Sequence, residues 1–489
     1  MEKKLEKKKI SKNVKIINII IWILFSCINL YALVTIKNIK LIPDKYFMII
    51  AAVIIGISLL FGMIVIISKY AKKFLIILSV IMVIIGGCEL YACVKVRSLT
   101  TFLNNNINSK YITNVYYVIA NSESKYNTLD DISGKEIYYY EDQENEEELI
   151  NNIYKNINNA KAEKEEDINK LFSNITKNKD YVAVINSGNY ESMGANDEKI
   201  DSKIKILGTF EIKSEVIEES TKNEISGQPF VIFINGIDTR SGKLPARSLS
   251  DVNIVMAVNT KTKNILMVHI PRDYYVSVHG KNGKKDKLTH TGTIGGVNLT
   301  MSTVEDLLNI KISNYARFNF NAVINLVDAI GGIDVYSDVD YSFNSYNIPA
   351  LVINPGMNHL NGNEALAFAK ERHAYASGDR HRGENQEQVI QRVIEKATSD
   401  ATLITKFDDI LASLNGTFET SLTLNEISSL VNESTTNSSK KWTIENCNLT
   451  GTDAHEYTLS YTNQKLYVMK PDTNTIKIAV DKLNNILEK

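Results

Sequence analysis

Cysteine is scarce in this chain, and its scarcity excludes a fold held together by disulfide bonds. The 489 residues include four cysteines, and Cys27, Cys88 and Cys93 fall inside long apolar segments. Cys447 is the only one in the more polar remainder. A folded part exposed outside the cytoplasm would therefore depend on its hydrophobic core rather than on cystine.

An excess of charge of either sign is also lacking. The chain carries 55 Lys and Arg against 56 Asp and Glu, so no global field favours binding to nucleic acid. Positive charge is instead concentrated at the start of the chain, directly before an apolar run. The lysines of this cluster are Lys3, Lys4, Lys7, Lys8, Lys9, Lys12 and Lys15.

Three apolar stretches, residues 14–36, 46–67 and 74–94, are each long enough to cross a bilayer as a helix, which takes about 20 residues. A cleavable signal peptide does not explain the first stretch, because its apolar region is too long and no small-residue cleavage site follows it. Buried helices of a soluble core do not explain three such runs joined by short polar links. The sequence therefore predicts three transmembrane helices.

The lysines also predict the orientation of these helices. The N-terminal tail, residues 1–13, and the loop that contains Lys69, Lys72 and Lys73 are both expected in the cytoplasm. Lysines in the first loop weaken this bias without reversing it. An odd number of spans then places everything after residue 94 outside. We predict a multi-pass protein of the cell membrane whose N-terminus is cytoplasmic and whose bulk is extracellular.

Residues 95–225 show alternating strand and helix patterns, which predict an α/β accessory domain with a partly parallel sheet. The strand-like runs are residues 115–120, 136–140, 181–185 and 203–212. Acidic helical stretches lie between them, at residues 144–157 and 165–175. This part shows no metal-ligand spacing, nucleophile motif or phosphate-binding loop, so we expect it to have a structural or partner-binding role.

The character of the chain changes at Pro229, where buried strands are predicted at residues 230–237, 252–258 and 265–270. Asp238 follows the first of these strands and Asp251 precedes the second. Two carboxylates that meet at a sheet edge could hold a divalent ion such as Mg²⁺, although each acid could equally cap a turn. Arg272 adds a cation at the same edge, and residues 287–296 are predicted to form a loop there.

Two helices are predicted farther along, at residues 363–372 and 384–397. Arg382 and Gln386 lie four residues apart at the entry of the second helix, so one lies above the other. Gln386 begins the apolar stripe and is expected to be buried, which requires a hydrogen-bond partner. An anion held by Arg382 at the helix N-terminus would supply one. Solvation at the surface is the alternative for any single arginine, but the set favours a polyanion site.

Several ordered segments resemble the LytR-CpsA-Psr (LCP) family: GIDTR, RSLSDVN, IPRDYY, KLTH with the following GG, DAIGGIDV, LNGNEALAFAKERH and GDRHRGENQ. The resemblance covers residues 228–400 and continues weakly through YVMKPD at 467–472. The three-span anchor and the intervening α/β unit resemble the capsule-associated, CpsA-like branch. The resemblance implies an α/β/α sandwich with a mixed central sheet and a hydrophobic lipid tunnel. It places a catalytic domain at residues 226–489, with a core at 228–400 and a C-terminal extension at 401–489.

The resemblance also implies a chemistry. Family members bind a polyprenyl pyrophosphate that carries a glycan, use Mg²⁺ (or Mn²⁺) at the pyrophosphate, and transfer the glycan phosphate to a hydroxyl of peptidoglycan. By motif match, the metal ligands would be Asp238 and Asp251, and the pyrophosphate-binding residues would be Arg240, Arg247, Arg272, Lys370, Arg372, Arg382 and Gln386. The expected catalytic residues are Asp238, Asp251, Arg272 and Arg382.

Two positions depart from the family pattern. Lys370 stands where the family usually has Arg, which keeps the charge but loses the bidentate fork, so the grip on pyrophosphate is expected to be weaker or altered. Arg247 precedes Asp251 by four residues, which is a looser spacing than that of the family.

The leading hypothesis is therefore a Mg²⁺-dependent phosphotransferase that attaches an anionic glycopolymer, of the capsular polysaccharide or wall teichoic acid type, to peptidoglycan. Its expected partners are the lipid-linked glycan, peptidoglycan, the membrane and the polymer-synthesis machinery. Nucleic acid is not expected, because the folded part lies on the other side of the membrane. A non-catalytic regulator of envelope polymer synthesis and a lipid-pyrophosphate hydrolase stay open as alternatives.

Overall fold

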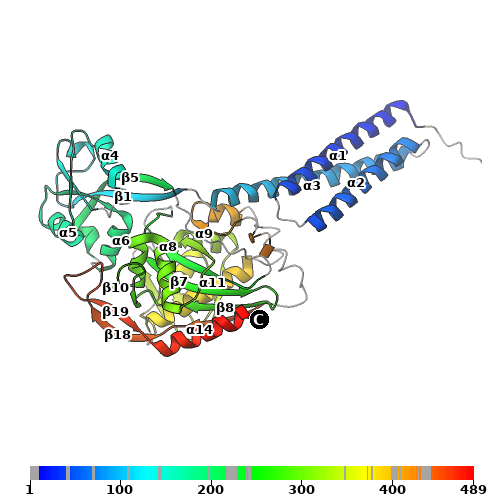
Figure 1. Ribbon diagram of the computed structural model, residues 1–489. Helices are drawn as coiled ribbons and strands as arrows, with labels where there is room; N and C mark the ends of the chain where they lie inside the picture. The colour runs from blue at the N-terminus through cyan, green and yellow to red at the C-terminus, as the bar shows by residue number, and fades with distance from the viewer. Residues whose placement is uncertain are drawn as a thin grey trace, which may run out of the picture. The chain divides into compact units, whose positions relative to one another are not determined.

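The computed structural model describes most of the chain in two compact units, one of Met1–Asn105 with Thr423–Ser438 and the other of Asn106–Leu422 with Ser439–Lys489 (Figure 1). The described residues are 10–39, 44–68, 72–106, 111–140, 146–196, 199–215, 228–237, 239, 244–345, 348–371, 373–375, 378–397, 406, 409–423, 426–427, 429–430 and 442–488.

The first unit contains the three apolar helices that the sequence predicts, α1 (Lys12–Ile39), α2 (Asp44–Ile67) and α3 (Lys72–Asn106). Each is long and apolar enough to cross a membrane. At 1.5 Å per residue, α3 extends for about 50 Å, whereas the hydrocarbon core of a bilayer is about 30 Å thick. Helix α3 therefore continues well beyond residue 94, where the apolar stretch ends.

Polar side chains of this unit meet between the helices. Ser79 Oγ donates to Asn18 Oδ1 at 2.5 Å, and the hydroxyls of Ser26 and Ser58 lie 2.8 Å apart. The indole of Trp22 donates to the backbone carbonyl of Ser58 at 2.8 Å. Large apolar side chains cover the outside of the helices. Polar contacts inside and apolar surface outside are the distribution expected of helices that pack in lipid.

The second unit begins with a five-stranded sheet of order β3-β2-β4-β1-β5. Its strands are β1 (Tyr111–Asn121), β2 (Glu136–Tyr139), β3 (Lys161–Lys164), β4 (Val182–Asn186) and β5 (Ile204–Glu215). Strands β2, β3 and β4 are parallel, and β1 pairs antiparallel with both β4 and β5. The partly parallel α/β sheet predicted from the sequence is therefore confirmed. We call residues 111–215 the five-stranded part.

Helices cover both faces of this sheet. They are α4 (Glu146–Asn156), α5 (Ile168–Lys177), α6 (Ser187–Asn196) and the short α7 (Ile200–Lys203). Because side chains alternate along a strand, Tyr116 and Val118 of β1 enter one core while Tyr117 and Ile119 enter the other. The sequence pattern missed β3, whose KAEK sequence carries no apolar alternation, and α6, which is rich in Gly, Ser and Asn.

A six-stranded mixed sheet of order β16-β11-β6-β7-β8-β17 forms the centre of the remaining chain. Its strands are β6 (Phe230–Ile237), β7 (Ser250–Asn259), β8 (Asn264–His269), β11 (Asn314–Asn319), β16 (Phe418–Thr420) and β17 (Thr443–Asn448). Strands β6, β7 and β8 form an antiparallel meander, and β11 and β17 add to it in parallel on either side.

Helices form a layer on each face of this sheet, which gives the predicted α/β/α architecture. Helices α8 (Leu288–Leu308) and α14 (Thr473–Glu488) share a core with β7 and β8. Helices α9 (Phe320–Ala329), α10 (Gly362–Lys370) and α11 (Asp379–Ala397) lie over the other face. Strand β17 and helix α14, which come from the last fifth of the chain, are thus integral to the sheet and its core.

Short two-stranded ribbons decorate this central sandwich. They are β9 (Tyr275–Ser277) with β10 (Lys285–Lys287), β12 (Ile333–Ser337) with β15 (Gly356–Leu360), β13 (Tyr341–Ser345) with β14 (Ile348–Ile353), and β18 (Gly451–Glu456) with β19 (Leu466–Pro471).

The predicted loop at residues 287–296 is wrong, because helix α8 begins at Leu288 and runs through this segment. The hydroxyls of Thr291 and Thr293 donate to backbone carbonyls three residues earlier in the helix. Non-helical φ/ψ values at Gly295 and Gly296 then kink the helix, and a Cβ at Gly296 would lie 2.7 Å from the carbonyl oxygen of Ala246. Gly296 thus allows helix α8 to pack closely against the backbone of Ala246, whereas the sequence pattern indicated that the glycine pair forms a turn.

Candidate functional site

Asp251 lies at the edge of the central sheet where β7 begins and β8 ends. These strands are antiparallel neighbours, so the start of one and the end of the other meet at the same edge. The loop after β8 brings Arg272 Nη1 to 3.0 Å from Asp251 Oδ1, and the hydroxyl of Thr289 in α8 donates to the same oxygen at 3.1 Å. The predicted juxtaposition of Asp251 and Arg272 is present in the fold.

Two further cations act on this carboxylate. The Asp251 side chain is only 11 % exposed. Burial by itself raises the pKa of Asp251, but the charges of Arg272, Arg382 and Lys370 outweigh this effect and lower the pKa below its usual value. Asp251 is therefore ionised at neutral pH. The structure brings together one predicted acid and three predicted cations from β7, the loop after β8, and helices α10 and α11.

Asp273 lies within ion-pair distance of Arg272 and was not among the predicted site residues. Its Oδ2 lies 3.7 Å from Arg272 Nε, and its Oδ1 accepts a hydrogen bond from Lys287 Nζ at 2.9 Å. Burial raises the pKa of Asp273, and the charges of Lys287 and Arg272 more than reverse this. The acid follows Arg272 directly in the IPRDYY segment, which was the available sequence signal. Asp273 thus adds a second negative charge beside the Arg272 guanidinium.

Helix α11 presents Arg382 and Gln386 one turn apart, and both are buried, with exposures of 9 % and 6 %. The helix begins at Asp379, earlier than the predicted residue 384, so Arg382 lies in its first turn. Gln386 Oε1 is buried and has no hydrogen-bond partner in the part of the chain that the structure describes. Because an ionised phosphate offers only acceptors, an anion held by Arg382 would leave this oxygen to a hydroxyl or a water.

His269, the last residue of β8, is a member of the site that sequence reasoning missed. Its ring is buried, and burial together with the charge of Arg382 lowers its pKa to about 4, although the neighbouring Gln386 side chain opposes this shift. The ring is therefore neutral at pH 7. A Cβ placed on Gly383 would lie 2.4 Å from its Cε1 atom, so the absence of a side chain at Gly383 lets α11 approach β8. Alternation along β8 was the signal that could have indicated which face His269 occupies.

An apolar cavity adjoins the charged cluster, between the sheet and helices α9 to α11. It is lined by Val252, Phe318, Phe320, Val323, Leu366, Ala369, Lys370, Gln386, Val389 and Ile390. Lys370 belongs to both the cavity wall and the group of cations around Asp251, and its ammonium lies 4.3 Å from the centre of the Phe320 ring. The cavity volume is about 30 Å³, so a hydrocarbon chain could enter only if side chains moved apart.

The other predicted residues are placed as follows. Asp238, Arg240 and Arg372 lie outside the described residues. Arg247 lines a second cavity, between the five-stranded part and helix α8.

A metal ion would have few protein ligands at this site. Among the described residues, no group of three or more His, Cys, Asp or Glu side chains could hold one. Mg²⁺ nevertheless needs only one or two carboxylates when phosphate oxygens and waters complete its shell. The ionised Asp251 fits that requirement.

The arrangement as a whole places buried cations beside an apolar cavity of an α/β/α sandwich. Residues 199–478, more than half of the chain, match the LytR_cpsA_psr family. The chain belongs to the LytR-CpsA-Psr family, as its motifs predicted.

Several curated relatives carry the name polyisoprenyl-teichoic acid–peptidoglycan teichoic acid transferase TagU. The protein from Enterococcus faecalis is 32 % identical over 216 residues, which cover 44 % of this chain and 69 % of the relative. The protein from Bacillus subtilis is 36 % identical over 199 residues, which cover 41 % of this chain and 62 % of the relative. A crystal structure of B. subtilis TagV is 28 % identical and has a TM-score of 0.44, covering 54 % of this chain and 98 % of TagV.

Proposed function

We propose that this chain is a phosphotransferase that attaches a polyprenyl-pyrophosphate-linked anionic glycopolymer to peptidoglycan. The observation that carries the proposal is the sharing of Lys370 between the cations around Asp251 and the wall of the apolar cavity. A lipid pyrophosphate has two linked phosphates next to a hydrocarbon chain. The cations of this site would face the phosphates, and the adjoining apolar walls would face the chain. The names of the TagU relatives favour a polymer of the wall teichoic acid type over capsule.

The reaction asks the protein mainly for positioning and charge neutralisation. A bond forms between a peptidoglycan hydroxyl oxygen and the phosphorus that carries the glycan, and the bond from that phosphorus to the lipid phosphate breaks. The lipid phosphate leaves with the electron pair, the proton of the acceptor hydroxyl passes through water to the departing phosphate, and Arg272 and Arg382 neutralise the charge that develops on that phosphate. The lowered pKa of Asp251 makes it a weak base, which suits it to holding a cation better than to removing the acceptor proton.

We also propose that Mg²⁺ or Mn²⁺ binds at Asp251, with Asp238 as the second ligand by motif match. When bound, the ion would neutralise part of the pyrophosphate charge. Lys370 would contribute a point charge in place of the bidentate fork of an arginine.

The proposed location of the reaction is outside the membrane. Three candidate spans and the lysine distribution support a cytoplasmic N-terminus and an extracellular location for the residues after α3, on the side where peptidoglycan lies. We assign residues 95–225 to an accessory domain and 226–489 to the catalytic domain. The polymer-synthesis machinery is the expected neighbour in the membrane.

Incubating the full-length protein in detergent with a lipid-pyrophosphate glycan, Mg²⁺ and a peptidoglycan oligomer tests the proposal. Glycan joined to the oligomer supports transfer. Release of lipid phosphate together with a free glycan phosphate would support the hydrolase instead. Binding of the lipid-linked glycan without turnover would support a regulator.

Asp251→Ala and Arg382→Ala are each expected to lower transfer by at least about 100-fold, because each removes a charge aimed at the reacting phosphates. Arg392→Ala is the matched control, since Arg392 lies on the same helix but pairs with Glu395 at the surface. Circular dichroism should show all three variants folded. Turnover at the wild-type rate in either site variant would remove the site assignment.

A further inference from the structure

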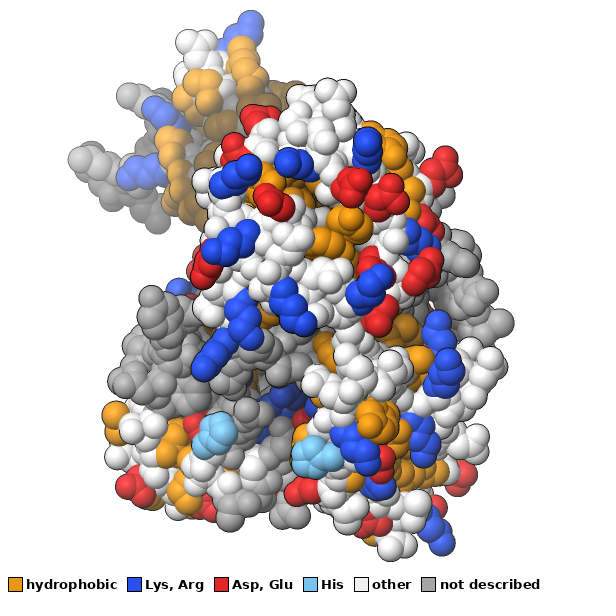
Figure 2. Space-filling view, turned by 90° about the vertical axis from the view of Figure 1, so that its left-hand side faces the viewer, with side chains coloured by type: hydrophobic (Ala, Val, Ile, Leu, Met, Phe, Trp, Pro, Cys, Tyr) orange, Lys and Arg blue, Asp and Glu red, His pale blue; other side chains and the backbone are white. Residues whose placement is uncertain are grey.

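A second and larger cavity lies where the five-stranded part meets helix α8 and the chain before β19. Its volume is about 220 Å³. It is lined by Tyr140, Ile168, Asn189, Ser192, Arg247, Lys281, Thr293, Ile294, Leu459, Ser460 and Tyr461. On the face drawn in Figure 2, Lys and Arg side chains gather around a hollow in the surface.

Hydrogen bonds join the two walls of this cavity. The backbone N–H of Ala246 donates to the carbonyl of Thr113 at 2.8 Å, and the hydroxyls of Ser192 and Tyr461 lie 3.3 Å apart. A Cβ on Gly188 would lie 3.0 Å from the backbone of Arg247, so the two walls are in direct contact. The five-stranded part therefore contributes half of a defined site.

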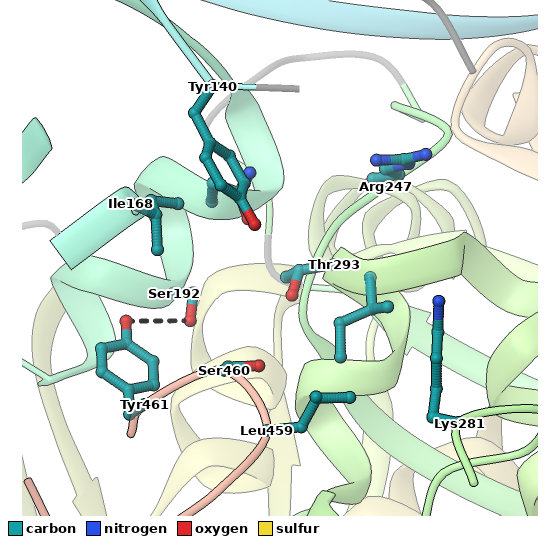
Figure 3. A pocket seen from close by; sticks show the side chains of 11 residues that line it. Tyr140, Ile168, Ser192, Arg247, Lys281, Thr293, Leu459, Ser460 and Tyr461 are labelled. Atoms are coloured by element: carbon teal, nitrogen blue, oxygen red, sulfur yellow. Dashed lines mark hydrogen bonds between the residues drawn. The ribbon is translucent and has the colours of Figure 1, made fainter. Parts of the chain in front are cut away.

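The walls combine cations, hydroxyl groups and aromatic rings. Arg247 is 7 % exposed, and Lys281 lies at the exposed turn between β9 and β10. Figure 3 shows the Tyr140 ring and the Lys281 side chain extending into the cavity from opposite sides, with Thr293 between them. None of the eleven lining residues is acidic. These walls suit a ligand that has apolar C–H faces, hydroxyl groups and a negative charge.

Two buried acids lie behind these walls, and both are engaged. Glu191 Oε2 accepts a hydrogen bond from the Ser248 hydroxyl at 2.5 Å. Asp286 Oδ2 accepts from the backbone N–H and the hydroxyl of Ser460, and its Oδ1 lies 2.7 Å from His290 Nδ1. These contacts hold both carboxylates behind the wall, and the charged side chains that line the ligand space itself are Arg247 and Lys281.

Helix α8 connects this cavity to the phosphate site. Thr289 donates to Asp251, and Thr293, four residues later, lines the cavity. Residues four apart share one face of a helix and are separated by about one turn, or about 5.4 Å along its axis. A ligand in the cavity would therefore lie next to the groups that react at Asp251.

We propose that this cavity binds one anionic sugar residue of a glycan that takes part in the reaction at Asp251. The volume is below the roughly 300–1,000 Å³ of pockets for drug-sized ligands, which limits the occupant to about one sugar ring with its charged substituent. The inference rests on the proposed function for the identity of the glycan. The sugar comes from the phosphorylated end of the donor polymer or from a carboxylate-bearing residue of peptidoglycan, and both present the same chemistry.

Binding titrations on the full-length protein in detergent, without lipid donor, test this proposal. One arm uses a peptidoglycan tetrasaccharide that retains its lactyl carboxylates, another uses N-acetylglucosamine 1-phosphate, and a neutral N-acetylglucosamine tetramer is the reference. At least one charged sugar should bind more tightly than the neutral tetramer. The charged sugar that binds identifies the source as acceptor or donor, and binding of both assigns the cavity to the shared chemistry.

Lys281→Glu should weaken binding of the charged sugar by about tenfold or more, because it replaces an attractive charge by a repulsive one. Lys284→Glu is the matched control, since Lys284 lies in the same exposed turn and does not line the cavity. It should change the affinity by less than about twofold. Equal affinities in the wild type and Lys281→Glu, or a neutral tetramer that binds as tightly as both charged sugars, would overturn the proposal. These titrations measure binding without turnover. They therefore test the sugar site even if the protein does not act as a transferase.

Discussion

Replacing Gly383 by Ala tests how closely helix α11 and strand β8 must fit for the site to work. The new Cβ would lie 2.4 Å from Cε1 and 2.6 Å from Nδ1 of the buried His269 ring. Ordinary contact requires a separation of about 3.5 Å, so the helix or the ring must move by about 1 Å. Overpacking of this kind costs about 1–3 kcal/mol, whereas Ala in a helix interior is more favourable than Gly by about 1 kcal/mol. The net loss of stability is expected to be up to about 2 kcal/mol.

The loss of activity should be larger than the loss of stability suggests. Helix α11 carries Arg382 and Gln386 on either side of Gly383, so a shift of the helix displaces both side chains from the reacting phosphates. A misplacement of about 1 Å can cost about 100-fold in rate. Transfer by Gly383→Ala is therefore expected to fall by about two orders of magnitude while the protein still folds.

A double-mutant cycle with His269→Ala separates steric overlap from other effects of the substitution. Once the ring is absent, Gly383→Ala keeps only the gain in helix propensity, so it should stabilise the protein by up to about 1 kcal/mol. Urea unfolding of the full-length protein in detergent, followed by Trp442 fluorescence in a Trp22→Phe background, measures all four members of the cycle. A stability change of the same sign in both backgrounds would refute the steric argument.

The remaining predictions concern pH and the lipid. Glu387 is buried, and burial followed by the charge of Glu384 raises its pKa from the ordinary 4.5 to about 8, so stability that depends on the neutral carboxyl is lost as the pH rises from about 4.5 to about 8. His269 has the opposite effect, because its pKa of about 4 lies below the ordinary value of 6.5, and stability is lost as the pH falls through this window. In a plot of unfolding free energy against pH, Glu387→Gln should therefore remove a fall between about pH 4.5 and 8, and His269→Asn a rise between about pH 4 and 6.5, each by up to about 1.4 kcal/mol per pH unit. Unchanged slopes would contradict the assignment of these groups. Ala369→Leu should fill the apolar cavity and slow transfer from a long polyprenyl donor more than from a donor with a single isoprene unit, and equal slowing would argue against a lipid channel there.

The sequence by itself determined the features that depend on neighbours along the chain. Apolar runs of bilayer length identified the three helices of the membrane anchor, because the thickness of a bilayer fixes the length of a spanning helix. Period-two and period-3.6 patterns identified four strands of the five-stranded sheet, the β6–β8 meander and helices α4, α5, α10 and α11, since these periods follow from local backbone geometry. Ordered family motifs indicated which acids and arginines to examine.

Tertiary structure decided which of those residues meet. Asp251 is surrounded by Arg272, Lys370 and Arg382 because the antiparallel pairing of β7 with β8, and the layer of helices above them, brings distant segments to one sheet edge. Arg247 precedes Asp251 by only four residues but lines a different cavity, because the direction of a side chain depends on strand and loop geometry as well as on sequence distance. The contact between His269 and Gly383 could not be read from either segment alone, since it exists only where a strand and a helix pack together.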